Sequence, residues 1–201
     1  KNSWFMLHRI REALRMKAGA ELDNVVEIDE VYIGGKVGNM SKSKRKKLRH
    51  EGNTYNTKQM VLGMLERGGN LKLLPMTYTA PNIQKAVKAN VSETASLITD
   101  ANSAYSDLKP VYASHEVVNH SAHEYVREGN IHTNSIEGAF SLLKRSIIGI
   151  YHQVTPKHLS RYCDETAYRY NLRKMKDSER FAFTLTNIEG RLTYKNLIAA
   201  E

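Results

Sequence analysis

The sequence is poor in cysteine, and that shortage excludes several kinds of site. Among its 201 residues Cys163 is the only cysteine, so the chain can form no internal disulfide and no cysteine cluster that would hold zinc. We expect Cys163 to be a small packing residue rather than a nucleophile. A single thiol also fits a reducing compartment, and a cytoplasmic location is therefore expected.

Long apolar runs are missing as well. No stretch of about 18 apolar residues occurs, so we expect neither a membrane-spanning helix nor a membrane partner. The residues after 1–5 lack the apolar stretch of a signal peptide, and the absence of an initiator methionine suggests a fragment. With 41% hydrophobic and 25% charged residues, the composition is that of a globular protein, and its length suits one full-sized domain.

Basic residues are concentrated in one short stretch. The net charge is +9, and seven of the cations lie between residues 36 and 50, where no acid occurs: Lys36, Lys42, Lys44, Arg45, Lys46, Lys47 and Arg49. Without them the chain would carry only +2. Concentrated basicity indicates a polyanion as partner, although a solvated loop is the alternative.

The pattern of apolar residues predicts a mixed α/β domain. Alternation and β-branched residues predict strands at 25–33, 59–65, 71–76, 95–99 and 116–119. Helices are expected at 3–17, at 81–91, from about residue 133, and at 156–175, with one or two short helices in the tail. In the first helix Ser3 is the expected cap, and Phe5, Ile10 and Leu14 form a rough apolar stripe. The basic stretch up to about residue 57 has no periodicity and is expected to be a long loop.

Three acidic residues occupy positions where a carboxylate needs an explanation. Asp29 stands in the middle of an apolar strand, where a charge is costly unless it is neutralised. Asp100 follows Leu97-Ile98-Thr99 at the end of a buried strand, which is where α/β sheets bind ligands. Two such acids can share one metal site, because hard cations such as Mg²⁺ take oxygen ligands.

Glu137 is the third candidate. It lies at the margin of a helical stripe formed by Ile136, Phe140, Leu143 and Ile147, and Lys144 projects from the same edge two turns later. A helix packed on the sheet would aim Glu137 at the strand acids. Each of the three acids also has a structural alternative. Asp29 could be a satisfied strand acid, Asp100 a turn or cap residue, and Glu137 a solvated residue at a helix edge.

Three linked segments resemble the DDE transposases of bacterial insertion sequences, in the ISXO-two-like branch (the IS fifteen-ninety-five group). The segments are 27–36 (EIDEVYIGGK), 97–105 (LITDANSAY) and 132–145 (HTNSIEGAFSLLKR). Residues 151–152 (YH), 156–162 (PKHLSRY) and 168–171 (YRYN) are also similar to that branch. The similarity runs from about residue 3 to about residue 173.

The resemblance implies an RNase H-like mixed sheet flanked by helices, with a C-terminal helical extension. Its domains would be an N-terminal helix (1–20), the catalytic domain (21–176, with a basic insertion at 36–57) and a helical tail (177–201). It also implies the catalytic acids Asp29, Asp100 and Glu137, accompanied by Lys144. Some members of the branch use Asn at the third position, so Asn134 is an alternative to Glu137. The family's usual N-terminal zinc module has no counterpart here, so recognition of transposon ends is expected to lie on a segment absent from this sequence.

The implied chemistry is cleavage of DNA at the transposon ends and transfer of the freed 3′-hydroxyl into target DNA. Two Mg²⁺ (or Mn²⁺) ions would be held by Asp29, Asp100 and Glu137, with Asp29 bridging both. Double-stranded DNA and further copies of the chain are the expected partners. The expected DNA contacts are Lys42, Lys44, Arg45, Lys46, Lys47, Arg49, Lys144, Arg145, Arg161 and Arg169. For the cations of 156–176, a solvated helix face is the alternative.

Three rival functions follow from the same residues. An RNase H-like nuclease would hydrolyse nucleic acid without joining it, and a transposase-derived DNA-binding protein would not be catalytic. The presence of all three acids argues against the second. A recombinase with a tyrosine nucleophile (Tyr105, Tyr162 or Tyr168) is disfavoured, because no evident Arg and His cluster surrounds any of these residues.

Overall fold

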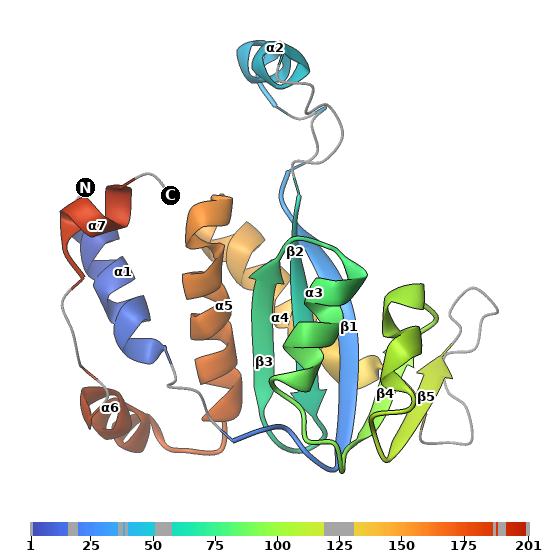
Figure 1. The fold of residues 1–201 in the computed structure, drawn as a ribbon. Coiled ribbons are helices and arrows are strands. Elements are labelled where there is room, and N and C mark those ends of the chain that lie inside the picture. Colours follow the sequence, from blue (N-terminus) through green and yellow to red (C-terminus); the bar gives the residue numbers. More distant parts are fainter. Residues whose placement is uncertain are drawn as a thin grey trace.

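The computed structural model describes residues 2–15, 20–35, 38, 40–50, 58–118, 131–186, 188 and 192–199. Its centre is a five-stranded sheet in the order β3-β2-β1-β4-β5 (Figure 1). The strands are β1 (Val25–Ile33), β2 (Gln59–Glu66), β3 (Leu71–Met76), β4 (Ser96–Asp100) and β5 (Ser114–Val118). The first three strands are antiparallel, while β4 and β5 run parallel to β1. A mixed sheet of this kind is what the family resemblance implied.

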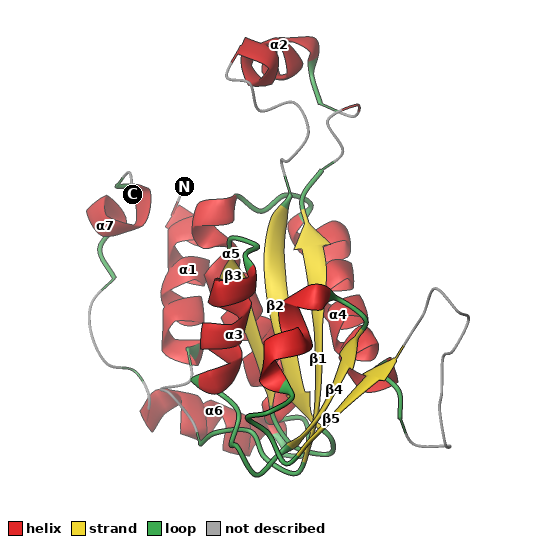
Figure 2. Ribbon diagram, turned by 45° about the vertical axis from the view of Figure 1, so that its right-hand side comes forward, coloured by secondary structure: helices red, strands yellow, loops and turns green. Residues whose placement is uncertain are grey.

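Helices cover both faces of the sheet, each over its own core (Figures 1 and 2). On one face α3 (Ala80–Lys88) and the 3-10 helix η2 (Ser103–Leu108) pack over Val26 and Ile28 of β1. On the other face α4 (Asn134–Ser146) and α5 (Pro156–Asn171) pack over Val31 and Ile33. Successive residues of a strand point to opposite faces, so Glu27 and Asp29 share the α4 face with Val31.

The remaining helices lie outside these two layers. They are α1 (Asn2–Leu14), α2 (Lys42–His50), α6 (Asp177–Thr186), α7 (Tyr194–Ile198) and a π-helical turn, η4 (Ile147–Tyr151), that continues α4. The helix α1 packs on α5 and also contacts α6. Within the described part of the chain, no helix combines the length and apolar character needed to cross a membrane.

The sequence predictions about the first helix and about α5 were wrong in detail. The first helix already includes Asn2, so Ser3 lies inside it, and its packed residues are His8 and Arg11. Ile10 of the predicted apolar stripe is 52% exposed. Arg11 is buried because Glu165 of α5 pairs with it at 2.9 Å, an interaction that apolar periodicity does not reveal. The helix α5 ends at Asn171, before the predicted residue 175.

The basic stretch was also predicted wrongly as a loop. Residues 42–50 form α2, which stands away from the body beyond the ends of β1 and β2 (Figure 1). These residues include no glycine, proline or β-branched residue, and Lys and Arg are good helix formers. The helix shows no apolar period because it has no core to face. Lys36 and residues 51–57 lie outside the described residues.

Candidate active site

Asp29, Glu30 and Asp100 bring one carboxylate oxygen each to within 4.8 Å of one another. The pairing of β1 with β4 ends at Ile28 and Thr99, so all three acids lie just beyond the last paired residues. Each is half-buried. The carboxyl end of β4 thus lies beside the middle of β1. We call the place where Asp29, Glu30 and Asp100 meet the notch, and these acids concentrate negative charge there.

Asp29 is the most perturbed of the three acids. Burial raises its pKa to about 7, and the nearby carboxylates of Asp100, Glu30 and Glu137 add to the rise. The backbone N–H of Glu30 opposes this by donating to Asp29 Oδ1 at 2.8 Å. The cost of ionising Asp29 in this setting is one that a bound cation would offset, because opposite charge favours the ionised form.

Glu30 is a member of this cluster that sequence reasoning missed. Its two oxygens accept hydrogen bonds from Asn102 Nδ2 and Tyr105 Oη, each at 2.5 Å, and burial raises its pKa. Strict alternation places Glu30 on the opposite face from Asp29, so the pattern gave no reason to group them. The adjacent acids Asp29-Glu30 in an apolar strand were the available signal.

Asp100 is oriented by its own turn. Its Oδ1 accepts from the backbone N–H of Asn102 at 3.1 Å, while the Asn102 side chain reaches Glu30. Asn102 thus connects β4 to β1 on the η2 side of the notch. Carboxylate oxygens are the ligands that hard divalent cations prefer, so Asp29, Glu30 and Asp100 could hold such an ion.

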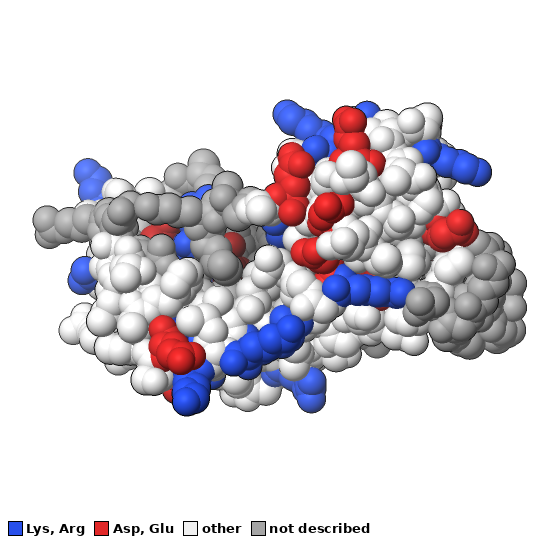
Figure 3. All heavy atoms as spheres, turned by 90° about the horizontal axis from the view of Figure 1, so that it is seen from below, with Lys and Arg blue, Asp and Glu red and all other residues white. Residues whose placement is uncertain are grey.

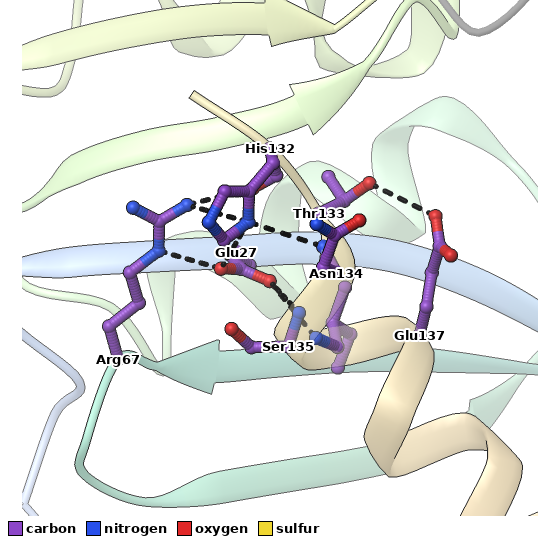
Figure 4. A network of polar contacts seen from close by, with 8 residues as sticks. Glu27, Arg67, His132, Thr133, Asn134, Ser135 and Glu137 are labelled. Carbon is purple, nitrogen blue, oxygen red and sulfur yellow. Dashed lines mark hydrogen bonds and ion pairs between the residues drawn. The ribbon is translucent and has the colours of Figure 1, made fainter. Parts of the chain in front are cut away.

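Glu137 lies in the first turn of α4 and is near Asp29, whose pKa it raises, but it is outside the group that lies within 4.8 Å. Its side chain is exposed and accepts a hydrogen bond from Thr133 Oγ1 at 3.3 Å. Asn134, the alternative, is the first residue of α4, and its backbone N–H donates to His132 Nδ1 at 3.4 Å (Figure 4). Lys144 and Arg145 are exposed two turns further along the helix.

A glycine sets how closely α4 approaches the sheet beside the notch. Gly63 of β2 pairs with Asp29, and a Cβ placed on it would lie 2.5 Å from Phe140 Cε1 and 2.8 Å from Ile136 Cδ1. Only a residue without a side chain allows this contact. The residue opposite Asp29 thus lets the helix that carries Glu137 pack against the strands.

The predicted DNA contacts fall into three places: α2, α5, and Lys144 and Arg145 on α4. Lys42, Lys46, Lys47 and Arg49 of α2 are exposed and Arg45 is partly buried, while the side chain of Lys44 lies outside the described residues. On α5, Arg161 pairs with Glu12 at 3.2 Å and Arg169 pairs with Glu165 at 3.0 Å. The structure therefore joins both α5 cations to carboxylates of the chain itself, away from the notch.

The fold and the notch define an α/β domain with a candidate divalent-cation site. The family model of the ISXO2-like transposase domain matches residues 21–171, and the chain belongs to that family. No curated protein matches the chain. A cryo-EM structure of the simian T-cell lymphotropic virus intasome in complex with PP2A regulatory subunit B56 gamma is similar at a TM-score of 0.40 and 12% identity. The match covers 74% of this chain and 49% of that one, so this chain spans about half of that relative's length.

Proposed function

We propose that this chain is the catalytic domain of a DNA transposase that cuts DNA at transposon ends and joins the freed 3′-hydroxyl to target DNA. The observation that carries the proposal is the meeting of Asp29 and Asp100 in one notch of an RNase H-like sheet, with Glu137 close by. Family membership supports it, since the matched model is a transposase domain. The acids come from three separate segments of the chain, so the fold itself assembles the group.

The chemistry of the donor set fits Mg²⁺ or Mn²⁺. Bound divalent ions would stabilise the attacking and leaving oxygens of an in-line displacement at phosphorus. Asp29 and Asp100 are the proposed ligands, with Glu137 as the third acid of the family pattern and Glu30 as an additional neighbour. Like charges held this close repel, so the protein without a cation carries an electrostatic cost at neutral pH.

DNA is the proposed substrate and target. The helix α2 follows the carboxyl end of β1, and β4 runs parallel to β1, so the basic helix leaves the sheet at the end that carries Asp100. Lys144 and Arg145 lie on the same helix as Glu137 and would contact backbone phosphates near the notch. Seen from the opposite end, the molecule has grouped acidic and scattered basic side chains rather than a basic surface (Figure 3). That end is therefore an unfavourable path for DNA.

A homo-oligomer is a further prediction, which sizing of the DNA complex would check.

The test is nicking of supercoiled plasmid in Mg²⁺ or Mn²⁺ by the wild type, Asp29→Asn and Asp100→Asn. Both variants are expected to bind DNA as the wild type does and to lose cleavage. Asp107→Asn is the matched control, because Asp107 is an exposed acid on η2 that bonds to Gln84. Thermal denaturation gives a second readout: Mn²⁺ should raise the melting temperature of the wild type and of the control, but not of the site variants. Wild-type cleavage by either site variant would contradict the proposal.

A further inference from the structure

Glu27 is a completely buried carboxylate on β1, two residues before Asp29 and on the same face of the sheet. Its Oε1 pairs with Arg67 Nε at 2.6 Å. Its Oε2 accepts from the backbone N–H groups of Ser135 at 2.9 Å and Ile136 at 3.0 Å (Figure 4). Burying a carboxylate is costly, and this one is compensated by a cation and by two amide donors.

The two amides belong to the first turn of α4, where N–H groups have no partner within the helix. Thr133 occupies the N-cap position, yet its side chain makes no capping hydrogen bond. Its hydroxyl donates to Glu137 instead. Glu27 therefore takes over the cap from a different element of the fold, and its negative charge also suits the positive end of the helix dipole.

Arg67 extends the same connection to the segment that enters α4. It follows the last residue of β2, and its Nη2 donates to the carbonyl oxygen of His132 at 2.9 Å. Its backbone N–H donates to the carbonyl of Val25 on β1 at 2.9 Å. The ion pair between Arg67 and the buried Glu27 thus ties β1, the end of β2 and the entry of α4 together.

We propose that Glu27 is a positioning residue for the active site, fixing the start of α4 so that Glu137 faces Asp29. This inference rests on the proposed function. The geometry supports it because Glu137 directly follows Ile136, whose N–H Glu27 holds, while Asp29 is two residues from Glu27 on one rigid strand. An error of about 1 Å in the placement of a catalytic group can cost about 100-fold in rate.

The test compares cleavage kinetics of the wild type and Glu27→Gln. The glutamine side chain is uncharged. Its single oxygen cannot both pair with Arg67 and accept from the two N–H groups of α4. We expect kcat to fall by about 10- to 100-fold, with little change in the DNA concentration that gives half-maximal rate. A loss confined to that concentration, or an unchanged kcat, would overturn the proposal.

Glu165→Gln is the matched control. Glu165 likewise forms an ion pair with an arginine, the buried Arg11 at 2.9 Å, but between α5 and α1. We expect a comparable drop in melting temperature and a normal kcat. If the control loses as much kcat as Glu27→Gln, the effect is one of general stability and the positioning role is refuted.

Amide hydrogen exchange gives a readout that does not depend on activity. The backbone amides of Ser135 and Ile136 should exchange faster in Glu27→Gln and at the wild-type rate in Glu165→Gln. Equal rates in all three proteins would refute the claim that Glu27 holds the start of α4. If Glu27→Gln does not fold, Glu27→Asp keeps the charge but is one methylene too short, and the same pattern is expected. A wild type that cleaves no DNA with any divalent cation would refute the proposed function. The exchange rates would still test whether Glu27 holds the start of α4.

Discussion

Gly63→Ala should damage the site through packing alone. The added Cβ would lie 2.5 and 2.6 Å from two ring atoms of Phe140 and 2.8 Å from Ile136 Cδ1. Carbon atoms pack best at about 3.5–4.0 Å, so a displacement of about 1 Å is required. Phe140 is 4% exposed and Ile136 is fully buried, so neither side chain can turn into open space. The helix α4 must therefore move away from β2 at the level of Asp29.

The magnitude follows from two opposing terms. Overpacking a core costs about 1–3 kcal/mol, whereas replacing a strand glycine with alanine recovers about 0.5–1 kcal/mol of backbone entropy. We expect a net loss of about 1 kcal/mol in the free energy of unfolding, measured by chemical denaturation. Because α4 carries Glu137, kcat for DNA cleavage should also fall, by at least about tenfold.

Gly138→Ala is the control for this substitution. Gly138 lies on the same helix, and a Cβ there would meet nothing within 4 Å. Alanine is favoured over glycine within a helix by about 1 kcal/mol, so this variant should be more stable than the wild type. A Gly63→Ala protein as stable and as active as the wild type would refute the claim that this contact sets the position of α4.

Three further predictions concern other parts of the molecule. Burial among α1 and α5, together with the Arg11 charge, lowers the pKa of His8 from 6.5 to about 4, so the unfolded chain binds more protons than the folded one between these values. The contribution of His8 to stability should therefore fall by about 2 kcal/mol from pH 7 to pH 5. The raised pKa of Asp29 acts in the opposite direction but is common to both proteins, so the wild type should lose about 2 kcal/mol relative to His8→Phe over this range; identical pH profiles for the two proteins would contradict this. Glu137→Gln should be inactive in cleavage while Asn134→Ala retains activity, and the reverse result would exchange their roles. Replacing the four cations at 44–47 of α2 with alanine should weaken binding to all duplexes alike and flatten the plot of log K against log salt by about two units, whereas an unchanged slope would mean that α2 does not contact phosphate.

The strands and the two strand acids could be predicted because local patterns encode them. Asp29 is conspicuous among β-branched residues, and Asp100 ends an apolar segment, so both positions follow from strand burial. The five strands, with both parallel and antiparallel pairs, agree with the mixed sheet expected from the resemblance. The beginning of α4 was also predictable, because its buried stripe of Ile136, Phe140 and Leu143 has a helical period.

The interactions that complete the site depend on contacts between distant segments. Glu27 meets Ser135 across 108 residues, and Glu30 meets Tyr105 across 75, so no local pattern joins them. Glu30 was missed because strict alternation assigns it to the face opposite Asp29. The two side chains nevertheless meet Asp100 where β4 ends. The helix at 42–50 was missed because a helix with no packed face has no apolar period. Sequence periodicity reports burial, whereas these features are set by charge pairing and solvent.

The most direct test of the central claim is a strand-transfer assay. Oligonucleotides carrying candidate terminal sequences from either side of the gene would be incubated with plasmid target and Mg²⁺, and joined products would be measured for the wild type, Asp29→Asn, Asp100→Asn and Asp107→Asn. We predict that the wild type and Asp107→Asn join the 3′-end to the plasmid, and that neither site variant does so while both still bind DNA. Joining by Asp29→Asn or Asp100→Asn at the wild-type rate would contradict the claim that these carboxylates form the active site.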